Sequence, residues 1–353
     1  MDIVFKTGIC SYGMSGKLFH APFIHAHPGY ELTAIVERHQ QDSRERYPSA
    51  RLYRSVEELC ANPDLQLIIV NTPTHLHYQH ACQVLNAGKH LVIEKRFAIS
   101  AQEATAIAAL AEKNKLFISV YQNRRYDGDY LAVKEVVDKN WLGEIREAEI
   151  RYDRYRPSFG GKAHKEGNLP GAGILWDLSP HLVDQAIQLF GFPHALFADC
   201  WKMRDDVQAN DYFELLFFYD RMRVRLKATC IARESNYAYT IHGMKGSFLQ
   251  ERSDMQEQQL LKGVIPSLQS WCPAPAAPDG LLHTLLNGEV IRKETISSPG
   301  NYMGYYDDVY KALTGKGPNP VPAAEAIQNM RIIDAALQSV SEKTDHRTLI
   351  SII

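Results

Sequence analysis

The chain of 353 residues is 45% hydrophobic and 23% charged, proportions typical of a folded globular protein of about two domains. Its 39 basic and 41 acidic residues leave a net charge of −2, which gives no support to a nucleic-acid or membrane-surface partner. No apolar run approaches about 18 residues, and a strand pattern begins at residue 3. We therefore expect a cytoplasmic protein with neither a membrane span nor a leader.

Cysteine and histidine spacing indicates neither a disulfide framework nor a metal site. The six cysteines are scattered without a C-x-x-C pair, at Cys10, Cys60, Cys82, Cys200, Cys230 and Cys272. We expect them to be reduced thiols. The histidines of the first 80 residues include His20, His75, His77 and His80, whose spacing matches no zinc site, so we expect no metal.

The first stretch with a recognisable motif runs from an apolar segment at residues 3–10 into a turn and then a helix-compatible segment. The turn, Ser11-Tyr-Gly13-Met14-Ser15-Gly16, matches the dinucleotide-binding fingerprint G-x-G-x-x-G with serine in the first position. Gly13 would let the backbone approach a pyrophosphate, and Gly16 would let the helix pack closely on the strand. The helix N-terminus would offer N–H groups to the anion. The alternative is a plain strand-to-helix turn of another α/β domain.

An acidic residue follows at the distance that the fingerprint requires. Residues 31–36 form a second expected strand, and Glu37 ends it 21 residues after Gly16. A carboxylate there hydrogen-bonds the ribose hydroxyls of NAD and repels the 2′-phosphate of NADP. Arg38 and His39 could bind that phosphate instead if Glu37 turned aside. The sequence thus leaves NAD and NADP open, with a slight preference for NAD.

Short apolar strands alternate with helical segments up to about residue 122. Further strands are expected at residues 65–70, 90–95 and 117–121, and helices at 55–59, 76–87 and 100–114. This alternation predicts an α/β domain, residues 1–123, with a parallel sheet covered on both faces. The strands end on polar residues that should converge on one crevice, namely Glu37, Asn71, Thr72, Glu94, Lys95, Gln122 and Asn123.

After residue 123 the pattern changes to longer strands. A helix is expected at 126–139, then strands at 147–155, 195–203, 212–219, 222–230 and 237–243, a loop at 263–280, and helices at 305–313 and 323–342. Val224, Leu226 and Ala228 alternate with basic residues, which predicts an antiparallel sheet with one packed face and one open face. Residues 124–353 therefore form an expected α+β domain.

Two features could carry chemistry. Lys95 ends a buried strand beside Glu94, where its side chain could reach the crevice. Asp177 and His181 lie four residues apart on an expected helix and so share one face. A carboxylate beside an imidazole suits a general base. The alternatives are a solvated surface lysine and a structural helical pair.

Several segments together carry a resemblance to a known family. They are residues 13–22, Thr72-Pro73 with His77, residues 87–95, 121–127 and 153–157, and residues 173–184. Over essentially its whole length the chain resembles the glucose–fructose oxidoreductase / inositol dehydrogenase / MocA family of NAD(P)-dependent oxidoreductases, above all the bacterial members typified by NADP-dependent scyllo-inositol dehydrogenase. The resemblance implies a Rossmann domain followed by an open-faced sheet domain that mediates homodimers or homotetramers.

The resemblance also implies roles for single residues. Lys95 matches the lysine of the family's Glu-Lys-Pro motif, and Asp177 and His181 complete the catalytic set. His181 would take the hydroxyl proton, Lys95 would hydrogen-bond the developing alkoxide, and Asp177 would hold the imidazole or a substrate hydroxyl. The remaining residues are expected along the cofactor, at Thr72, Pro73, His77, Glu94 and Asn123, or around a sugar, at Arg124, Tyr155 and Trp176.

Two departures from the family pattern concern the same region. Ser11 replaces the first fingerprint glycine, and Arg96 replaces the proline of the Glu-Lys-Pro motif. Proline fixes φ and has no N–H, so arginine frees the backbone beside Lys95. Either Lys95 is displaced or Arg96 points away and the site survives.

We therefore expect an NAD(P)-dependent oxidoreductase that acts on a secondary alcohol or ketone of a sugar or inositol. Arg96 keeps open a catalytically silent protein that senses a dinucleotide. A redox-assisted glycosidase of the same fold is the third alternative.

Overall fold

The computed structural model describes residues 3–161, 166–167, 171–341 and 350–352. The chain divides into two compact units. The first unit holds Met1–Tyr126, Met255–Pro273 and Asn301–Ile327, and the second holds Asp127–Asp254, Ala274–Gly300 and Gln328–Ile353. The first unit thus includes two later segments in addition to the residues before the expected boundary at residue 123.

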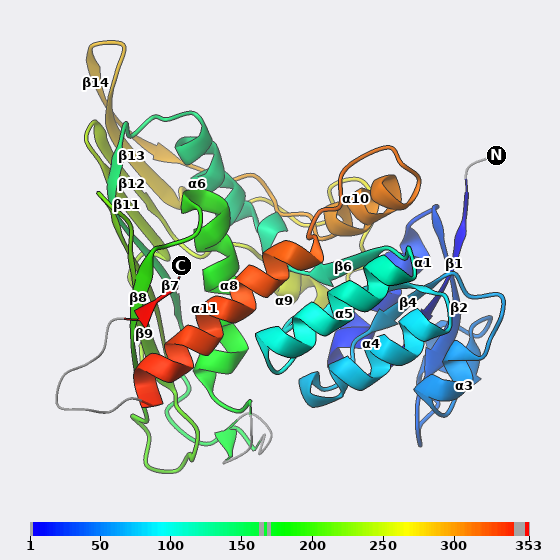
Figure 1. Cartoon of the computed structure of the whole chain (residues 1–353). Coiled ribbons are helices and arrows are strands. Elements are labelled where there is room, and N and C mark those ends of the chain that lie inside the picture. The colour runs from blue at the N-terminus through cyan, green and yellow to red at the C-terminus, as the bar shows by residue number, and fades with distance from the viewer. Residues whose placement is uncertain (1–2, 162–165, 168–170, 342–349, 353) are drawn as a thin grey trace. The chain divides into compact units, whose positions relative to one another are not determined.

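A six-stranded parallel sheet forms the centre of the first unit (Figure 1). Its order is β3-β2-β1-β4-β5-β6. The strands are β1 (Phe5–Ile9), β2 (Tyr30–Val36), β3 (Arg51–Tyr53), β4 (Leu67–Val70), β5 (His90–Glu94) and β6 (Ile118–Tyr121). The strand order reverses between β1 and β4, and ligands of such sheets bind beyond the carboxyl ends of the strands at this reversal. The predicted α/β fold is confirmed.

Helices connect these strands. They are the π-helix η1 (Gly16–His20), α1 (Ala21–Ala26), α2 (Ser43–Arg46), α3 (Val56–Cys60), the 3-10 helix η2 (Thr74–Leu76), α4 (His77–Asn86), α5 (Ala101–Lys113) and the 3-10 helix η3 (Asn123–Tyr126). Ser55 and Ser100 cap α3 and α5, because their hydroxyls accept hydrogen bonds from the N–H groups of Glu58 and Glu103. Serine is among the residues most favoured at this position. Figure 1 shows α4 and α5 side by side along the sheet.

Two later helices of the first unit are α9 (Gln256–Leu261) and α10 (Met303–Leu313). Helix α10 contributes a cluster of buried tyrosines. The ring of Tyr306 stacks on Phe23 with 5.7 Å between centroids, and Tyr305 meets Tyr121 edge-on at 4.9 Å. The hydroxyls of Tyr306 and Tyr121 both donate to the carbonyl of Phe19, in the π-helix. The aromatic residues thereby hold the segment after the fingerprint turn in place.

The second unit contains a nine-stranded, mostly antiparallel sheet of order β14-β13-β12-β11-β7-β10-β9-β8-β15, in which β7 and β10 pair in parallel. Its strands are β7 (Ile145–Asp153), β8 (Ala195–Trp201), β9 (Tyr212–Phe218), β10 (Arg223–Thr229), β11 (Tyr239–Gly243), β12 (Gly246–Gln250), β13 (Gly280–Leu286), β14 (Glu289–Thr295) and β15 (Ile350–Ser351). The predicted open-faced α+β fold is confirmed.

One face of this sheet packs on helices α6 (Gly128–Asp138), α8 (Ile174–Phe190) and α11 (Ala323–Ser341). Val224, Leu226 and Ala228 of β10 are fully buried in this core, whereas the alternating basic residues lie on the other face. The alternation in the sequence therefore gave the correct orientation of β10.

The hairpin of β13 and β14 was not predicted from the sequence, and its tip projects from the second unit (Figure 1). Its turn is Asn287-Gly288, with φ values of 51° and 85°. Asparagine followed by glycine is the most favourable pair for a two-residue hairpin turn, because both positions require positive φ. That dipeptide was the signal in the sequence.

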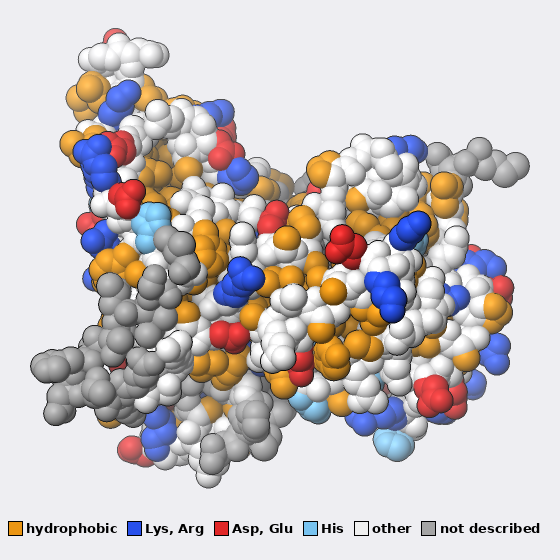
Figure 2. Space-filling view, viewed as in Figure 1, with side chains coloured by type: hydrophobic (Ala, Val, Ile, Leu, Met, Phe, Trp, Pro, Cys, Tyr) orange, Lys and Arg blue, Asp and Glu red, His pale blue; other side chains and the backbone are white. Residues whose placement is uncertain are grey.

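Figure 2 shows acidic and basic side chains interspersed over the visible face of each unit, in keeping with the net charge of −2. Among the helices in the described part of the chain, none is long and apolar enough to cross a membrane.

Candidate functional site

A cavity of about 420 Å³ lies at the strand reversal of the first sheet. Segments that follow β1, β2 and β4 form most of its wall, and the loop between β3 and α3 closes it. Of the expected cofactor residues, the cavity is lined by Ser11, Gly13, Glu37, Arg38, Thr72 and Pro73. Of the polar strand ends that the sequence predicts to converge, those after β2 and β4 contribute to this cavity, through Glu37 and Thr72.

The turn after β1 depends on glycine at one position in particular. A Cβ added to Gly16 would lie 2.1 Å from the carbonyl oxygen of Ser11, so any larger residue would displace the turn. A Cβ on Gly13 would meet only the Ser11 hydroxyl, at 3.6 Å. The protein itself therefore does not require glycine at position 13, which fits a position that leaves room for a bound pyrophosphate.

Ser11 takes the place of the first fingerprint glycine without backbone strain. Among the described residues other than glycine, positive φ occurs at Lys115, Asn140 and Asn287, and not at Ser11. The Ser11 hydroxyl accepts a hydrogen bond from the Gly13 N–H at 3.3 Å, and its carbonyl accepts one from Asn71 at 2.8 Å. Serine thus supports the turn with its side chain.

Glu94, at the end of β5, connects this strand to the turn. Its carboxylate accepts hydrogen bonds from the Ser15 hydroxyl at 2.8 Å and from its neighbour's N–H, that of Lys95, at 3.0 Å. The imidazole of buried His20 lies 3.0 Å away. Burial would raise the pKa of Glu94, but His20, Lys95 and Ser15 together hold that pKa below its ordinary value. Two expected cofactor residues, Ser15 and Glu94, thus bond each other.

Glu37 directly follows β2, and its carboxylate is hydrogen-bonded within the protein. Its oxygens accept hydrogen bonds from the N–H groups of Asp42 and Ser43, at 3.0 and 3.1 Å, and from the Ser43 hydroxyl. Only 7% of Glu37 is exposed. The carboxylate therefore serves the start of α2.

His77 is the first residue of α4, and its imidazole is buried between two loops. Nε2 lies 2.8 Å from the carbonyl oxygen of Thr72, and Nδ1 lies 2.7 Å from that of Arg96. Burial lowers the pKa of His77 below its ordinary value, although both carbonyls oppose this. His77 connects the loop after β4 to the segment that follows Lys95.

Lys95 directly follows β5, and the peptide bond between Lys95 and Arg96 is cis. Arg96 is buried, with 6% of its surface exposed. Of the other expected residues in the first unit, Met14 is 53% exposed and Asn123 is buried. Arg124 forms an ion pair with Glu257 at 3.0 Å.

In the second unit, Asp177 and His181 lie on α8, one turn apart. Asn210 caps this helix, because its carbonyl oxygen accepts from the Ile174 N–H and its side-chain oxygen accepts from that of Leu175. Asp177 sits in the first turn, where the helix dipole favours a negative charge. Its carboxylate accepts from Arg154 at 3.2 Å, and His181 is 5% exposed.

Asp177 lines a cavity of about 270 Å³ within the second unit. Arg154, Arg156 and Arg204, which the sequence analysis did not select, contribute guanidinium groups to its wall. Arg204 is itself held by Asp211 at 2.7 Å and by Glu166 at 3.0 Å. The basic residues of the stretch from 151 to 156 were the available signal.

The other two expected sugar-site residues differ in environment. Tyr155 is 43% exposed, and its hydroxyl accepts from Arg233, whose guanidinium also lies over the tyrosine ring at 4.3 Å. Trp176 is half-buried on α8.

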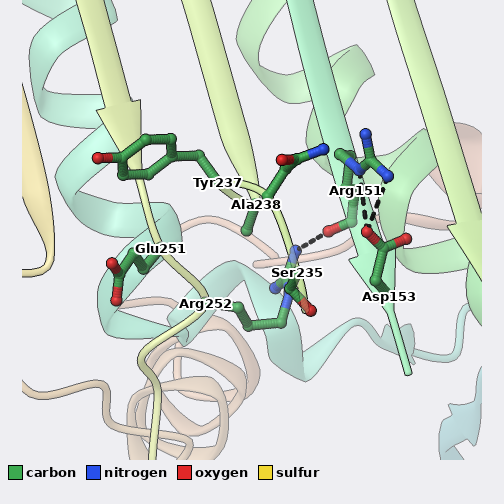
Figure 3. Close-up of a pocket in the computed structure, with 8 residues that line it drawn as sticks. Arg151, Asp153, Ser235, Tyr237, Ala238, Glu251 and Arg252 are labelled. Carbon is green, nitrogen blue, oxygen red and sulfur yellow. Dashed lines mark hydrogen bonds and ion pairs between the residues drawn. The ribbon is translucent and has the colours of Figure 1, made fainter. Parts of the chain in front are cut away.

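A third cavity, of about 520 Å³, lies beside β7 (Figure 3). Its charged residues largely bond each other. The guanidinium of Arg151 contacts Asp153 at 2.9 Å, and Arg252 donates to the carbonyl of Arg151 at 2.9 Å. Among the residues that the structure describes, no cluster of acidic, histidine or cysteine side chains could hold a metal ion.

Both units of the chain match models of one known protein family. Residues 5–122 match the NAD-binding Rossmann-fold model of the GFO_IDH_MocA oxidoreductase family, and residues 134–348 match its C-terminal alpha/beta model. The chain belongs to the Gfo/Idh/MocA oxidoreductase family. The resemblance inferred from the sequence motifs is therefore confirmed.

Similar proteins match nearly the full length of the chain. The uncharacterized oxidoreductase YdgJ of Escherichia coli is 35% identical, over 96% of this chain and 97% of its own. The scyllo-inositol 2-dehydrogenase (NADP(+)) IolW of Bacillus subtilis is 34% identical, over 96% and 94%. The solved structure of yvaA from Bacillus subtilis has a TM-score of 0.93 at 32% identity, with 99% of both chains covered. The protein is accordingly an NAD(P)-dependent oxidoreductase.

Proposed function

We propose that this Gfo/Idh/MocA oxidoreductase transfers hydride to or from a secondary alcohol or ketone of a sugar or inositol. The observation that carries the proposal is the attachment of Lys95 to the fingerprint turn. Glu94 bonds both Ser15 of the turn and the backbone N–H of Lys95. A bound nicotinamide cofactor would supply or accept the hydride there.

The residues of the second unit would handle the proton. In the oxidation direction, His181 takes the proton of the substrate hydroxyl, and Lys95 donates a hydrogen bond to the developing alkoxide. Asp177 holds the imidazole or a second hydroxyl of the substrate. A polyhydroxylated substrate agrees with the guanidinium and carboxylate groups beside Asp177, and the relative IolW acts on scyllo-inositol by its name.

The direct test is to incubate the protein with NAD or NADP and a panel of inositols and aldoses while following the absorbance of reduced nicotinamide. We expect turnover of at least one member. Lys95→Ala should lower kcat by about 100-fold or more without weakening cofactor binding. Lys113→Ala, at an exposed position of α5, is the matched control and should leave kcat unchanged.

Other outcomes would favour the alternatives. Tight cofactor binding without turnover of any substrate would support a dinucleotide sensor and contradict the proposal. Release of an aglycone from a glycoside, with no net change in reduced cofactor, would support redox-assisted glycoside cleavage.

We also propose that the open face of the second sheet mediates a homodimer or homotetramer. Trp201 ends β8 on that face with 60% of its surface exposed, and an exposed tryptophan favours a protein contact. Light scattering after gel filtration should give a multiple of the chain mass of 40.0 kDa, and Trp201→Glu should lower it. Met244→Glu, which is 68% exposed between β11 and β12, is the control. A monomeric wild-type protein would contradict the proposal.

A further inference from the structure

The cofactor cavity of the first unit carries an inference about which dinucleotide it accepts. The deciding residue is Glu37, since a carboxylate at the end of β2 ordinarily binds the ribose hydroxyls of NAD. Its three donors, the N–H groups of Asp42 and Ser43 and the Ser43 hydroxyl, come from the start of α2. A carboxylate has about four acceptor positions, so most of its capacity is used within the protein. Few acceptor positions of Glu37 therefore remain for a ribose hydroxyl.

Cationic side chains line the same cavity. Arg38 and Arg54 are exposed and contribute to its wall, together with His39. Within the described parts of the chain, no carboxylate forms an ion pair with Arg38 or Arg54. Their charge is therefore available to a ligand.

Arg54 is also oriented by the loop that it faces. Its Nη1 donates to the carbonyl oxygens of Glu37 and Gln40, at 2.8 and 2.6 Å. These two bonds fix one edge of the guanidinium and leave its other N–H groups for an anion. A planar guanidinium held in this way suits bidentate binding of phosphate.

The cavity wall also includes a histidine from α4. His80 lies there and contacts Thr72 at 2.9 Å. Burial is the main reason that the pKa of His80 is lowered, and the charges of His77 and Arg38 add to the effect. Arg38 therefore acts electrostatically on another residue of the cavity wall.

We propose that Arg38 and Arg54 bind the 2′-phosphate of NADP(H), and that the protein prefers NADP(H) to NAD(H). This inference rests on the proposed function, because it concerns the cofactor of the same site. The phosphate brings close to two negative charges, which both arginines neutralise, whereas the free 2′-hydroxyl of NAD meets a carboxylate whose acceptor positions are mostly used by the protein. The slight preference for NAD that Glu37 suggests from the sequence is thereby reversed.

The test uses binding of half-cofactors, which requires no turnover. Calorimetry compares adenosine 2′,5′-bisphosphate with adenosine 5′-monophosphate, and then NADPH with NADH. We expect the 2′-phosphate to strengthen binding about tenfold or more at low salt, and less at high salt. Arg38→Ala should remove most of this ratio, as should Arg54→Ala, while binding of the monophosphate stays within about twofold.

Two further variants test whether the cavity arginines, rather than Glu37 or any nearby arginine, set the cofactor preference. Arg51→Ala is the matched control, because Arg51 packs over the ring of Tyr53 and does not line the cavity. It should leave the ratio unchanged. Glu37→Gln should affect NADH and NADPH binding alike if Glu37 only supports α2. A selective loss of NADH binding in Glu37→Gln, or equal affinity of the wild-type protein for both half-cofactors, would overturn the inference.

Failure of the proposed function gives a different result. If neither NADPH nor NADH binds, the cofactor site itself is wrong. If NADH binds as tightly as NADPH and sugars are still oxidised, the proposed oxidoreductase function holds and the preference for NADP(H) is wrong.

Discussion

Two polar networks in this protein are both built around glutamate carboxylates, but one is buried and the other is exposed. At the strand ends of the first sheet, Glu94, His20 and Ser15 bond one another where little solvent reaches them. On the open face of the second sheet, Arg225 joins Glu214 and Glu149 while its side chain stays 42% exposed. The first network fixes loops around a cavity, and the second covers a sheet face.

The difference predicts how each network responds to mutation. Removing one member of a buried network leaves its partners without hydrogen bonds, which costs about 1–3 kcal/mol for each stranded group. Exposed ion pairs exchange protein contacts for water and contribute about 0–1 kcal/mol each. Variants should therefore fall into two classes of stability, divided by burial.

Gly16→Ala should give the largest effect, because it breaks the buried network at its turn. The added methyl would lie 2.1 Å from the Ser11 carbonyl, so the turn must shift and carry Ser15 away from Glu94. We expect a loss of about 3 kcal/mol in the free energy of unfolding, measured by urea titration. Gly13→Ala, whose methyl meets only the Ser11 hydroxyl at 3.6 Å, should retain wild-type stability but weaken cofactor binding. Equal stability of the two variants would contradict this reasoning.

Glu94→Ala should follow, with a loss of about 2–4 kcal/mol, since it strands His20, Ser15 and the Lys95 N–H. Glu94→Gln keeps an acceptor and should lose less. The pKa of Glu94 is lowered in the folded protein from an ordinary 4.5. Its ionisation therefore stabilises the protein above that pH, and this contribution disappears as the pH falls toward the folded pKa. Stability curves of wild type and Glu94→Gln should converge in acid, and parallel curves would argue against the network.

His77 gives a pH test of the same buried region. Its pKa is lowered on folding from an ordinary 6.5, so the unfolded chain takes up the proton first as the pH falls. Stability should be complete above pH 6.5 and decrease below it, by at most about 1.4 kcal/mol per pH unit for one group. His77→Gln should flatten this decrease, although His27, His80 and His90, whose pKa values are also lowered, retain part of it. His75→Gln, at an exposed position, should change nothing. An unchanged slope in His77→Gln would contradict the assignment.

Much of the fold could be predicted because periodic apolar residues decide which face is buried. The parallel strands of the first unit and the orientation of β10 follow directly from that pattern. Strand β14 was missed because it is largely exposed. Strand β13 does have alternate buried positions, including Leu282, which were not recognised in the sequence. A strand without a buried face, such as β14, has no apolar alternation in its sequence. The signal for this hairpin was the Asn287-Gly288 turn.

The residues of the candidate site came from sequence motifs, and their roles stay predictions. The motif located Glu37, Glu94 and His77, which resemble ligand-binding residues in sequence. Each is also hydrogen-bonded within the protein, to Ser43, Ser15 and the Thr72 carbonyl respectively. Side-chain direction at a strand end depends on which N–H groups the next loop brings near, and one sequence does not record that. The preference for NAD suggested by Glu37 depends on this missing information.

The smallest loss of stability should come from a mutation in the exposed network, and it tests the expectation that exposed ion pairs contribute little. Arg225→Ala removes contacts to Glu214 at 2.8 Å and to Glu149 at 3.3 Å, but Arg151 still pairs with Glu149 at 3.0 Å. Because solvent replaces the lost contacts, we expect the free energy of unfolding to fall by less than about 1 kcal/mol, and by still less at high salt. A double-mutant cycle with Glu214→Ala would isolate the pair. A coupling above about 2 kcal/mol would mean that this face is buried in the native assembly, because only a desolvated ion pair contributes that much.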